Sequence, residues 1–177
     1  GDGRDDLLWH RAGPDPDYVW HARGDGGFSS TRHEVSGDFQ PLRGDFNGDC
    51  VDDVLWYAPG APRDSMWLGQ RNRTFRNVSV NIEGVYEPVV GDFNGDRAED
   101  ILWYRPGTAT DRIWYGTVFA RFVARSTVVN GSYRPLAGDF DGDGRDDVLL
   151  CGEGAAPDAP WRGAQPSGFT ARAADSD

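Results

Sequence analysis

The sequence predicts an all-β protein built from repeated blades of short antiparallel strands. The string Gly-Asp-Phe-Asn/Asp-Gly-Asp begins at Gly44, Gly91 and Gly138, which sets a period of 47 residues. Gly (24) and Pro (11) are abundant among the 177 residues, and both favour turns. No stretch keeps the 3.6-residue hydrophobic period of an amphipathic helix. Short strands joined by turns are therefore expected throughout.

The third repeat illustrates the strands expected in each blade. Residues 88–93 form a short apolar strand that leads into an acidic loop, and residues 100–104 form the strand that leaves it. Residues 105–107 (Arg-Pro-Gly) are typical of a turn. Residues 112–116 and 119–129 supply the third and fourth strands. Four antiparallel strands in about 47 residues is the size of one β-propeller blade.

The repeats leave the chain incomplete at both ends. We expect one repeat domain over residues 1–177, with repeats at 1–43, 44–90, 91–137 and 138–177. The chain opens inside the acidic motif, and its last repeat stops about where the next incoming strand should begin. A blade cannot bury both of its faces alone. The expected assembly is therefore a fragment of a ring, a ring completed by another copy of the chain, or an open repeat assembly.

Aromatic and acidic columns run through the repeats. Trp9, Trp56 and Trp103 form one column, and Phe28, Phe75, Phe122 and Phe169 form another. A further column pairs an Asp with a Trp three residues later: Asp17 and Trp20, Asp64 and Trp67, Asp111 and Trp114, Asp158 and Trp161. A carboxylate for sugar hydroxyls beside an indole face would suit a glycan site. The alternative is that each Asp caps the second hairpin and each Trp belongs to the core.

The acidic loop of each repeat has the pattern of a calcium site. In the third repeat, positions 1, 3, 5 and 9 of a nine-residue loop are Asp92, Asn94, Asp96 and Asp100. Alternate side chains of a tight loop point at a common centre, and the backbone carbonyl of Ala98 at position 7 would add another oxygen. Hard oxygen ligands in this number suit Ca²⁺, which takes about 6–8 of them. Mg²⁺ keeps more water, and Zn²⁺ prefers His or Cys.

The remaining loops repeat this pattern to different extents. The second offers Asp45, Asn47, Asp49, the carbonyl of Val51, and Asp53; the fourth offers Asp139, Asp141, Asp143, the carbonyl of Arg145, and Asp147. The first keeps Asp2, the carbonyl of Arg4, and Asp6. Written tail to head, Asp175 and Asp177 would restore its missing ligands and complete a fourth Ca²⁺ site, within a closed ring or between copies. The alternative is a frayed acidic tail.

Two other calcium-loop types, and a purely structural role for the Asp residues, agree less well with the sequence than the nine-residue calcium loop does. An EF-hand needs a Glu at position 12, where these repeats have Trp or Leu. A toxin-type β-helix repeats every nine residues or so, not every 47. Asp residues that only form turns would not require several carboxylates in every repeat. His10, His21 and His33 fall only in the first repeat, and we expect surface side chains there rather than a metal pair.

These residues resemble the FG-GAP (VCBS-like) repeat. The pattern Asp-x-Asn/Asp-Gly-Asp-x-x-x-Asp, preceded by Gly and followed by an apolar strand, is that of the calcium-loop blade of integrin-alpha-type β-propellers. The resemblance covers essentially the whole chain. It implies that a structural Ca²⁺ lies in the loop between the first two strands of a blade, held by the positions named above. Asn47 and Asn94 replace Asp at position 3, which implies weaker binding there.

Composition and motifs narrow the function. The net charge of −11 offers no basic stripe for nucleic acid, and no apolar run approaches the roughly 20 residues of a membrane helix. Neither a nucleophile elbow nor a phosphate loop indicates an enzyme. We expect an extracellular or secreted Ca²⁺-binding module with a non-catalytic binding or adhesion role toward a glycan or protein. The alternatives are a structural subunit that self-assembles through its incomplete ends into a Ca²⁺-stabilised ring or filament, and an accessory part of a secreted hydrolase.

Overall fold

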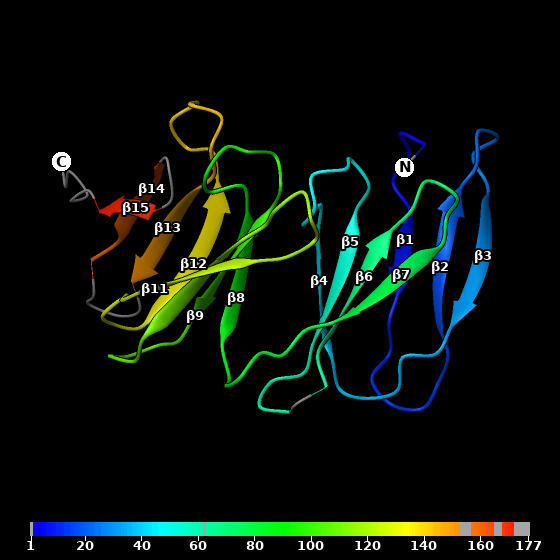
Figure 1. The fold of residues 1–177 in the computed structure, drawn as a ribbon, viewed down its shortest axis with the longest axis horizontal. Helices are drawn as coiled ribbons and strands as arrows, with labels where there is room; N and C mark the ends of the chain where they lie inside the picture. The colour runs from blue at the N-terminus through cyan, green and yellow to red at the C-terminus, as the bar shows by residue number, and fades with distance from the viewer. Residues whose placement is uncertain (1, 62, 153–156, 165–167, 172–177) are drawn as a thin grey trace. The chain divides into compact units, whose positions relative to one another are not determined.

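The structure is a computed structural model that describes residues 2–61, 63–152, 157–164 and 168–171 (Figure 1). These residues form fifteen β-strands, arranged in four antiparallel sheets. Within them no helix is found that is long and apolar enough to cross a membrane. The predicted all-β fold of propeller-like blades is confirmed.

The chain divides into two compact units, which are described separately. The first unit comprises Gly1–Arg43 and Val51–Gly84, and the second comprises Gly44–Cys50 and Val85–Asp177. The second acidic loop is therefore divided, because residues 45–50 belong to the second unit whereas Val51 and Asp53 belong to the first.

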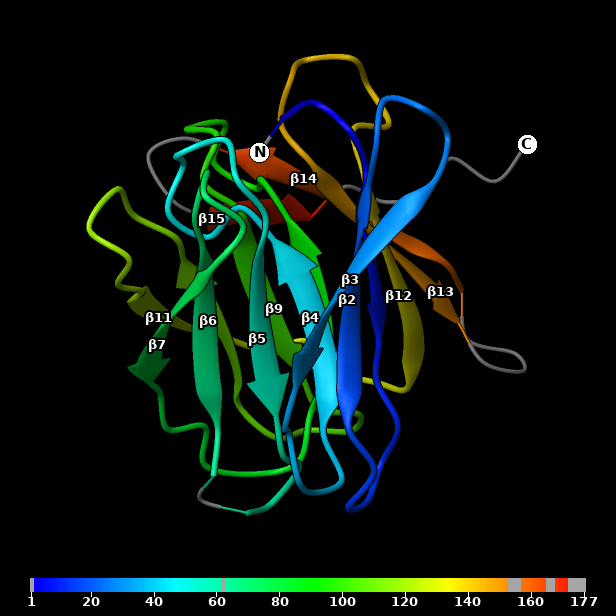
Figure 2. The ribbon, with the colours of Figure 1, turned by 90° about the vertical axis from the view of Figure 1, so that its right-hand side faces the viewer.

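The first unit contains a three-stranded and a four-stranded sheet, with strand orders β1-β2-β3 and β4-β5-β6-β7. In Figure 2 the strands β2, β4, β5 and β6 run upright. The bounds are β1 (Leu7–Trp9), β2 (Asp17–Ala22), β3 (Phe28–His33), β4 (Gln40–Gly44), β5 (Asp53–Tyr57), β6 (Ser65–Gly69) and β7 (Phe75–Ser79).

The second unit contains two four-stranded sheets, with strand orders β8-β9-β10-β11 and β12-β13-β14-β15 (Figure 1). The bounds are β8 (Glu87–Gly91), β9 (Asp100–Tyr104), β10 (Asp111–Tyr115), β11 (Val123–Thr127), β12 (Tyr133–Gly138), β13 (Asp147–Gly152), β14 (Ala159–Ala164) and β15 (Gly168–Ala171).

Each four-stranded sheet begins one strand before the repeat boundary chosen in the sequence. Strands β4, β8 and β12 end at Gly44, Gly91 and Gly138, where the acidic motif starts. The acidic loop thus joins the first two strands of each of these sheets. This is where the FG-GAP resemblance implies a calcium loop.

In the four-stranded sheets the second strand is the most buried element. All five residues of β5 and of β9 are buried, which agrees with the run of four apolar residues that follows the first Asp in each strand. The outer strands β7 and β11 are mostly exposed. Burial therefore decreases from the second strand of the blade to the last.

Neighbouring blades share their hydrophobic core within each unit. In the second unit, Leu102 and Ile113 of one sheet lie in the same cluster as Val148 and Leu150 of the next. In the first unit, Trp56 and Val54 of the second sheet form a cluster against which Leu8 of the first sheet packs. The expectation that a blade depends on its neighbour for a core is thus met in both units.

Candidate metal centre

The first aspartate of the third loop organises the loop backbone. Asp92 Oδ1 accepts hydrogen bonds from the backbone N–H of Gly95 (2.7 Å) and Asp96 (3.1 Å), and Oδ2 accepts one from Arg97 N–H (2.8 Å). Gly95 has a φ of 75°, in the left-handed region that glycine adopts at low cost. The Asp92 carboxylate therefore holds the backbone of the next five residues in a turn around it.

The next two ligand positions of the third loop are in direct contact. Asn94 Oδ1 accepts a hydrogen bond from Asp96 N–H (2.8 Å), and Asn94 Nδ2 donates to Asp96 Oδ2 (3.2 Å). Asp96 Oδ1 in turn accepts a hydrogen bond from Ala98 N–H (2.9 Å). The side chains at positions 3 and 5 are thereby turned toward each other.

The last aspartate of the loop is buried and joins the loop to the sheet. Asp100 Oδ2 accepts a hydrogen bond from Phe93 N–H (3.0 Å), and Oδ1 accepts one from Gly116 N–H (2.9 Å) at the end of β10. Burial raises the pKa of Asp100 to about 8. The hydrogen bond from Gly116 N–H lowers this pKa, whereas the neighbouring carboxylates of Asp96 and Asp92 raise it further. A cation beside these three carboxylates would favour the charged form of Asp100.

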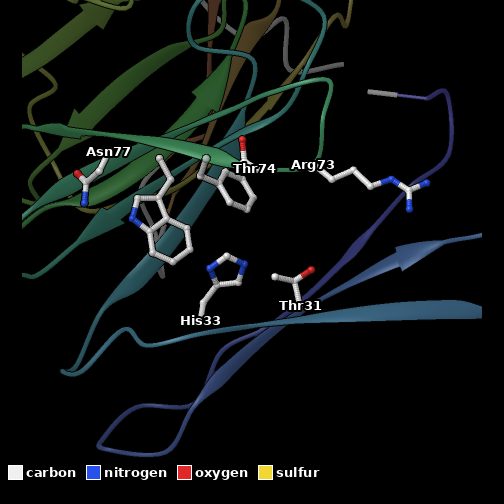
Figure 3. Close-up of a pocket in the computed structure, with 7 residues that line it drawn as sticks. Thr31, His33, Arg73, Thr74 and Asn77 are labelled. Carbon is white, nitrogen blue, oxygen red and sulfur yellow. The ribbon is translucent and has the colours of Figure 1, made fainter.

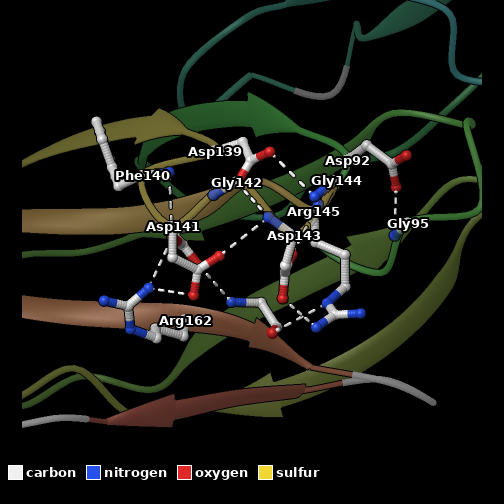
Figure 4. A network of polar contacts seen from close by, with 12 residues as sticks. Asp92, Gly95, Asp139, Phe140, Asp141, Gly142, Asp143, Gly144, Arg145 and Arg162 are labelled. Carbon is white, nitrogen blue, oxygen red and sulfur yellow. Dashed lines mark hydrogen bonds and ion pairs between the residues drawn. The ribbon is translucent and has the colours of Figure 1, made fainter.

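The fourth loop has the same backbone hydrogen bonds around its first aspartate as the third loop. It also has one more carboxylate, because Asp141 stands where the third loop has Asn94. Asp139 Oδ1 accepts hydrogen bonds from Gly142 N–H (2.7 Å) and Asp143 N–H (3.1 Å), and Oδ2 accepts one from Gly144 N–H (3.0 Å) (Figure 4). One carboxylate oxygen each from Asp139, Asp141 and Asp147 lies within 4.8 Å of the others. Such a set of hard oxygen donors fits Ca²⁺.

An arginine from the third strand of the blade reaches into the fourth loop. The guanidinium of Arg162 on β14 donates to Asp141 Oδ2, and the same Nη1 lies 3.7 Å from Asp147 Oδ2 (Figure 4). Arg145 makes a similar contact with Asp143 at the rim. Arg162 therefore places a positive charge between two of the predicted ligands.

The residue at the Arg162 position differs in every repeat. The column contains His21, Leu68, Tyr115 and Arg162. The buried hydroxyl of Tyr115 has no partner among the described residues, and burial, followed by the charge of Asp100, raises the pKa of Tyr115 to about 12. The chemistry next to the position-9 aspartate is thus specific to each loop.

The part of the second loop in the second unit has the same backbone arrangement. Asp45 Oδ1 and Asn47 Oδ1 both accept hydrogen bonds from Asp49 N–H (3.0 and 2.9 Å), and Asp45 Oδ2 accepts one from Cys50 N–H (2.7 Å). In the first unit, Asp53 is buried and its Oδ1 accepts a hydrogen bond from Gly69 N–H (2.8 Å).

The first loop uses its two aspartates differently. Asp6 Oδ2 lies 2.9 Å from His21 Nδ1, and Asp6 Oδ1 accepts a hydrogen bond from Ala22 N–H (3.0 Å). Asp2 is paired with the guanidinium groups of Arg4 (2.6 Å) and Arg73 (3.0 Å). Its predicted partners Asp175 and Asp177 lie outside the described residues.

The three histidines are not surface side chains, contrary to expectation. His21 is buried, and its two ring nitrogens lie within hydrogen-bonding distance of the Asp6 carboxylate and the Thr31 hydroxyl (3.2 Å). His10 is half-buried, with Nδ1 2.8 Å from Asp17 Oδ1. Each of these two rings is thus paired with a carboxylate.

Two features of the loops were not predicted from the sequence. Position 6 takes a left-handed backbone, with φ values of 65° at Cys50 and 74° at Arg97, a conformation that costs a non-glycine residue free energy. The signal was present, because Gly3 and Gly144 occupy the same position in the first and fourth loops. The second feature is the acidic residue at position 8.

Position 8 links one loop to the loop before it in the second unit. Glu99 Oε2 accepts a hydrogen bond from Asp45 N–H (2.7 Å), while Glu99 N–H donates to the Asp45 carbonyl (2.8 Å). Asp146 makes the same two bonds to Asp92, at 3.0 and 2.8 Å. The third and fourth acidic loops are thus each hydrogen-bonded to the position-1 residue of the preceding loop.

A comparison with protein families identifies the repeat. The match extends over residues 45–103, from the start of the second loop into β9. Residues 45–103 match the family model of an FG-GAP-like repeat. The predicted resemblance is confirmed for this segment, which includes the second and third acidic loops. No curated protein matches the chain.

The Asp-x-x-Trp column has a structural role. Asp111 Oδ1 accepts a hydrogen bond from Arg105 N–H and Oδ2 accepts one from Val129 N–H, both at 2.7 Å. Asp17 and Asp64 make the equivalent pairs of bonds, and all three are buried. Sugar hydroxyls cannot reach these carboxylates, so the glycan-site assignment is wrong for Asp17, Asp64 and Asp111. Of the four aspartates in this column, only Asp158 is exposed. It accepts a hydrogen bond from Gly152 N–H.

The tryptophans of the column stack on other aromatic rings. Trp67 lies between Trp56 and Phe75, with ring centroids 5.1 and 5.3 Å away. Trp114 lies at 5.4 Å from Trp103 and 5.3 Å from Phe122. Each of these indole rings therefore contacts two other aromatic side chains of the protein.

A pocket of about 300 Å³ opens in the first unit between β3 and β7 (Figure 3). It is lined by Thr31, His33, Trp67, Arg73, Thr74, Phe75 and Asn77. Burial, followed by the charge on His21, lowers the pKa of His33, which favours the neutral ring. The residues that line the pocket thus include neutral hydrogen-bonding groups, the aromatic rings of Trp67 and Phe75, and one cation, Arg73.

Proposed function

We propose that the chain is an extracellular Ca²⁺-binding repeat module with a non-catalytic, structural and binding role. The observation that carries the proposal is the convergence of Asp139, Asp141 and Asp147 inside a backbone cage that Asp139 organises. Without a cation, carboxylates at this separation repel one another. Asp92, Asn94, Asp96 and Asp100 form the corresponding set in the third loop.

The loop residues would hold the ion between the two strands that they connect. Positions 1, 3 and 5 supply side-chain oxygens, and the carbonyls of Ala98 and Arg145 are the proposed position-7 ligands. The buried position-9 aspartate connects the ion to the sheet, because its second oxygen is bonded to the third strand of the blade. When bound, Ca²⁺ supplies positive charge that offsets the repulsion. Three bound ions would change the formal net charge from −11 to −5.

Extracellular Ca²⁺ concentrations suit such sites. Modules of this kind bind Ca²⁺ with dissociation constants of about 10⁻⁴–10⁻³ M. Asn47 and Asn94 lower the ligand charge of the second and third loops, which favours the weak end of this range. A secreted or cell-surface protein would meet enough Ca²⁺ to fill them.

Isothermal titration with Ca²⁺ tests the proposal, and Arg162→Leu sharpens the test. We expect the wild type to bind Ca²⁺ at more than one site. Arg162→Leu introduces the residue of the second repeat, Leu68, and removes the cation that contacts Asp141. Because a hydrogen bond to a charged group is worth about 1.5–3 kcal/mol, the affinity of the fourth loop should rise by about tenfold or more.

The matched control is Arg134→Leu, an exposed arginine of β12 outside the cluster. It also removes one positive charge, so a general electrostatic effect would raise the affinity equally in both variants. A wild-type protein that takes up no Ca²⁺ would contradict the proposed function. An unchanged or weaker fourth site in Arg162→Leu would contradict the role given to Arg162.

For the binding role we propose the pocket of the first unit as the ligand site. Its hydroxyl, amide and imidazole groups around Trp67 suit a glycan, which needs hydrogen bonds beside an apolar surface. On a glycan array, the wild type should bind a defined subset of sugars and Asn77→Ala should lose that binding. Asn130→Ala, in an exposed position of the second unit, should retain it. Equal binding by both variants, or none by the wild type, would contradict this site.

A further inference from the structure

A repeated aromatic contact within the second unit links the acidic motif of one repeat to the following repeat. Phe46 packs against Phe122 of the next blade at 5.7 Å between ring centroids, and Phe93 packs against Phe169 at 5.0 Å. In both pairs the second Phe follows the first by 76 residues. Phe46 and Phe93 are 1% and 0% exposed. The contact therefore recurs with the repeat and buries the Phe of the acidic motif completely.

The same blade boundary carries the polar contact of position 8. Asp45 and Asp92, which precede the two motif phenylalanines, each donate their N–H to the acidic side chain of the next blade, Glu99 or Asp146. A blade boundary thus has two halves. One half is the motif Asp and Phe. The other half is a Phe at or just before the start of the last strand, together with a position-8 acid.

The fourth blade presents the first half without a counterpart among the described residues. Phe140 of its motif is 57% exposed. Leu136 on β12 is also exposed, whereas its equivalents Leu42 and Val89 are buried. Large exposed apolar side chains on one face indicate an interaction surface.

The first blade presents the second half. Phe28 stands in the column of Phe122 and Phe169 and is 43% exposed. It stacks with Trp20 at 5.9 Å, and Trp20 stacks with Trp9 at 5.3 Å, so the rings form one continuous exposed cluster. Asp5, also exposed, holds position 8 of the first loop. The equivalents of the groups that receive a motif Asp and Phe elsewhere in the chain are therefore present and exposed in the first blade.

We propose that the fourth blade of one copy docks on the first blade of a second copy, head to tail. Phe140 would pack against Phe28 of the second copy, and the Asp139 N–H would donate to its Asp5. The partner is a second copy because this chain carries both halves of the contact, in the residue types that already bind each other at two blade boundaries. Such a contact is heterologous, since two different surfaces meet. It does not require the Ca²⁺ sites.

Sedimentation velocity with three single variants tests the interface. We expect the wild type to sediment as species of two or more copies of the 19.5 kDa chain. Phe140→Asp and Phe28→Asp should each be monomeric, because each places a charge in the proposed contact. The control is Phe119→Asp, which alters a phenylalanine that is 80% exposed but lies outside both halves, and it should associate like the wild type. Circular dichroism of each variant checks that the fold is kept.

A mixture of the two disrupted variants tests the head-to-tail direction. Phe140→Asp keeps an intact first blade and Phe28→Asp keeps an intact fourth blade, so an equimolar mixture should form a dimer of one copy of each and stop there. A monomeric wild type, loss of association in Phe119→Asp, or no dimer in the mixture would overturn the proposal. Each measurement is made in Ca²⁺ and in EGTA, so that failure of the interface is distinguished from failure of Ca²⁺ binding in the titration above.

Discussion

Removal of Ca²⁺ with EGTA is expected to lower the Tm by roughly 5–10 °C for each site that is emptied. At a Ca²⁺ concentration 100-fold above the dissociation constant, a site that exists only in the folded chain contributes about 2.7 kcal/mol. A chain of this size loses about 2–4 °C of Tm per kcal/mol. The position-9 aspartates transmit the effect, because Asp100 and Asp147 connect the loop to the third strand of the blade.

Differential scanning calorimetry in EGTA, in excess Ca²⁺ and in excess Mg²⁺ measures this effect. Re-addition of Ca²⁺ should restore the Tm, while Mg²⁺ should restore less of it, because Mg²⁺ holds its water and demands octahedral geometry. EGTA already saturated with Ca²⁺ serves as the control for the chelator itself. Equal Tm values in EGTA and in Ca²⁺ would show that the acidic loops do not bind the ion.

Asp111→Ala is expected to destabilise the second unit by about 2–6 kcal/mol. The substitution leaves the N–H groups of Arg105 and Val129 without their acceptor, and each buried unsatisfied group costs about 1–3 kcal/mol. The equivalent bonds of Asp17 and Asp64 indicate that the first three blades use this carboxylate to hold the second hairpin. Urea denaturation in excess Ca²⁺ measures the loss while keeping the acidic loops saturated.

Asp158→Ala is the matched control for Asp111→Ala. It removes the equivalent carboxylate of the fourth repeat. Asp158 is exposed and accepts a hydrogen bond from Gly152 N–H. The expected loss is about 1 kcal/mol or less, because water can replace an exposed acceptor. If the two variants lost the same stability, the burial of Asp111 would not be the source of its effect.

The sequence was sufficient for the features that depend on the repeat alone. The period of 47 residues placed the acidic loops, the Trp columns and the strands, because equivalent positions in a repeat have equivalent environments. Asp92, Asn94 and Asp96 were predicted to face one another because they alternate along one short loop. Their backbone contacts are local, so no knowledge of the tertiary fold was needed.

The features that the sequence did not reveal depend on contacts between distant segments. Arg162 reaches Asp141 because β14 pairs with β13 in the register that places Trp161 opposite Val148. Glu99 binds Asp45 across a blade boundary, 54 residues away. The sequence alone could not separate the glycan hypothesis from the alternative that each Asp caps the second hairpin. The N–H groups that bind Asp111 and support the alternative belong to Arg105 and Val129, 6 and 18 residues away.

The link from each acidic loop to the one before it makes the loops of the second unit a coupled series. Glu99 and Asp146 each follow the position-7 carbonyl of their own loop and bind the position-1 residue of the preceding loop. An ion that ordered one loop as proposed would therefore also fix a proposed ligand of its neighbour. The natural description of such a chain is a one-dimensional set of nearest-neighbour free energies, in which the coupling between blades is carried by their acidic loops as well as by their hydrophobic faces.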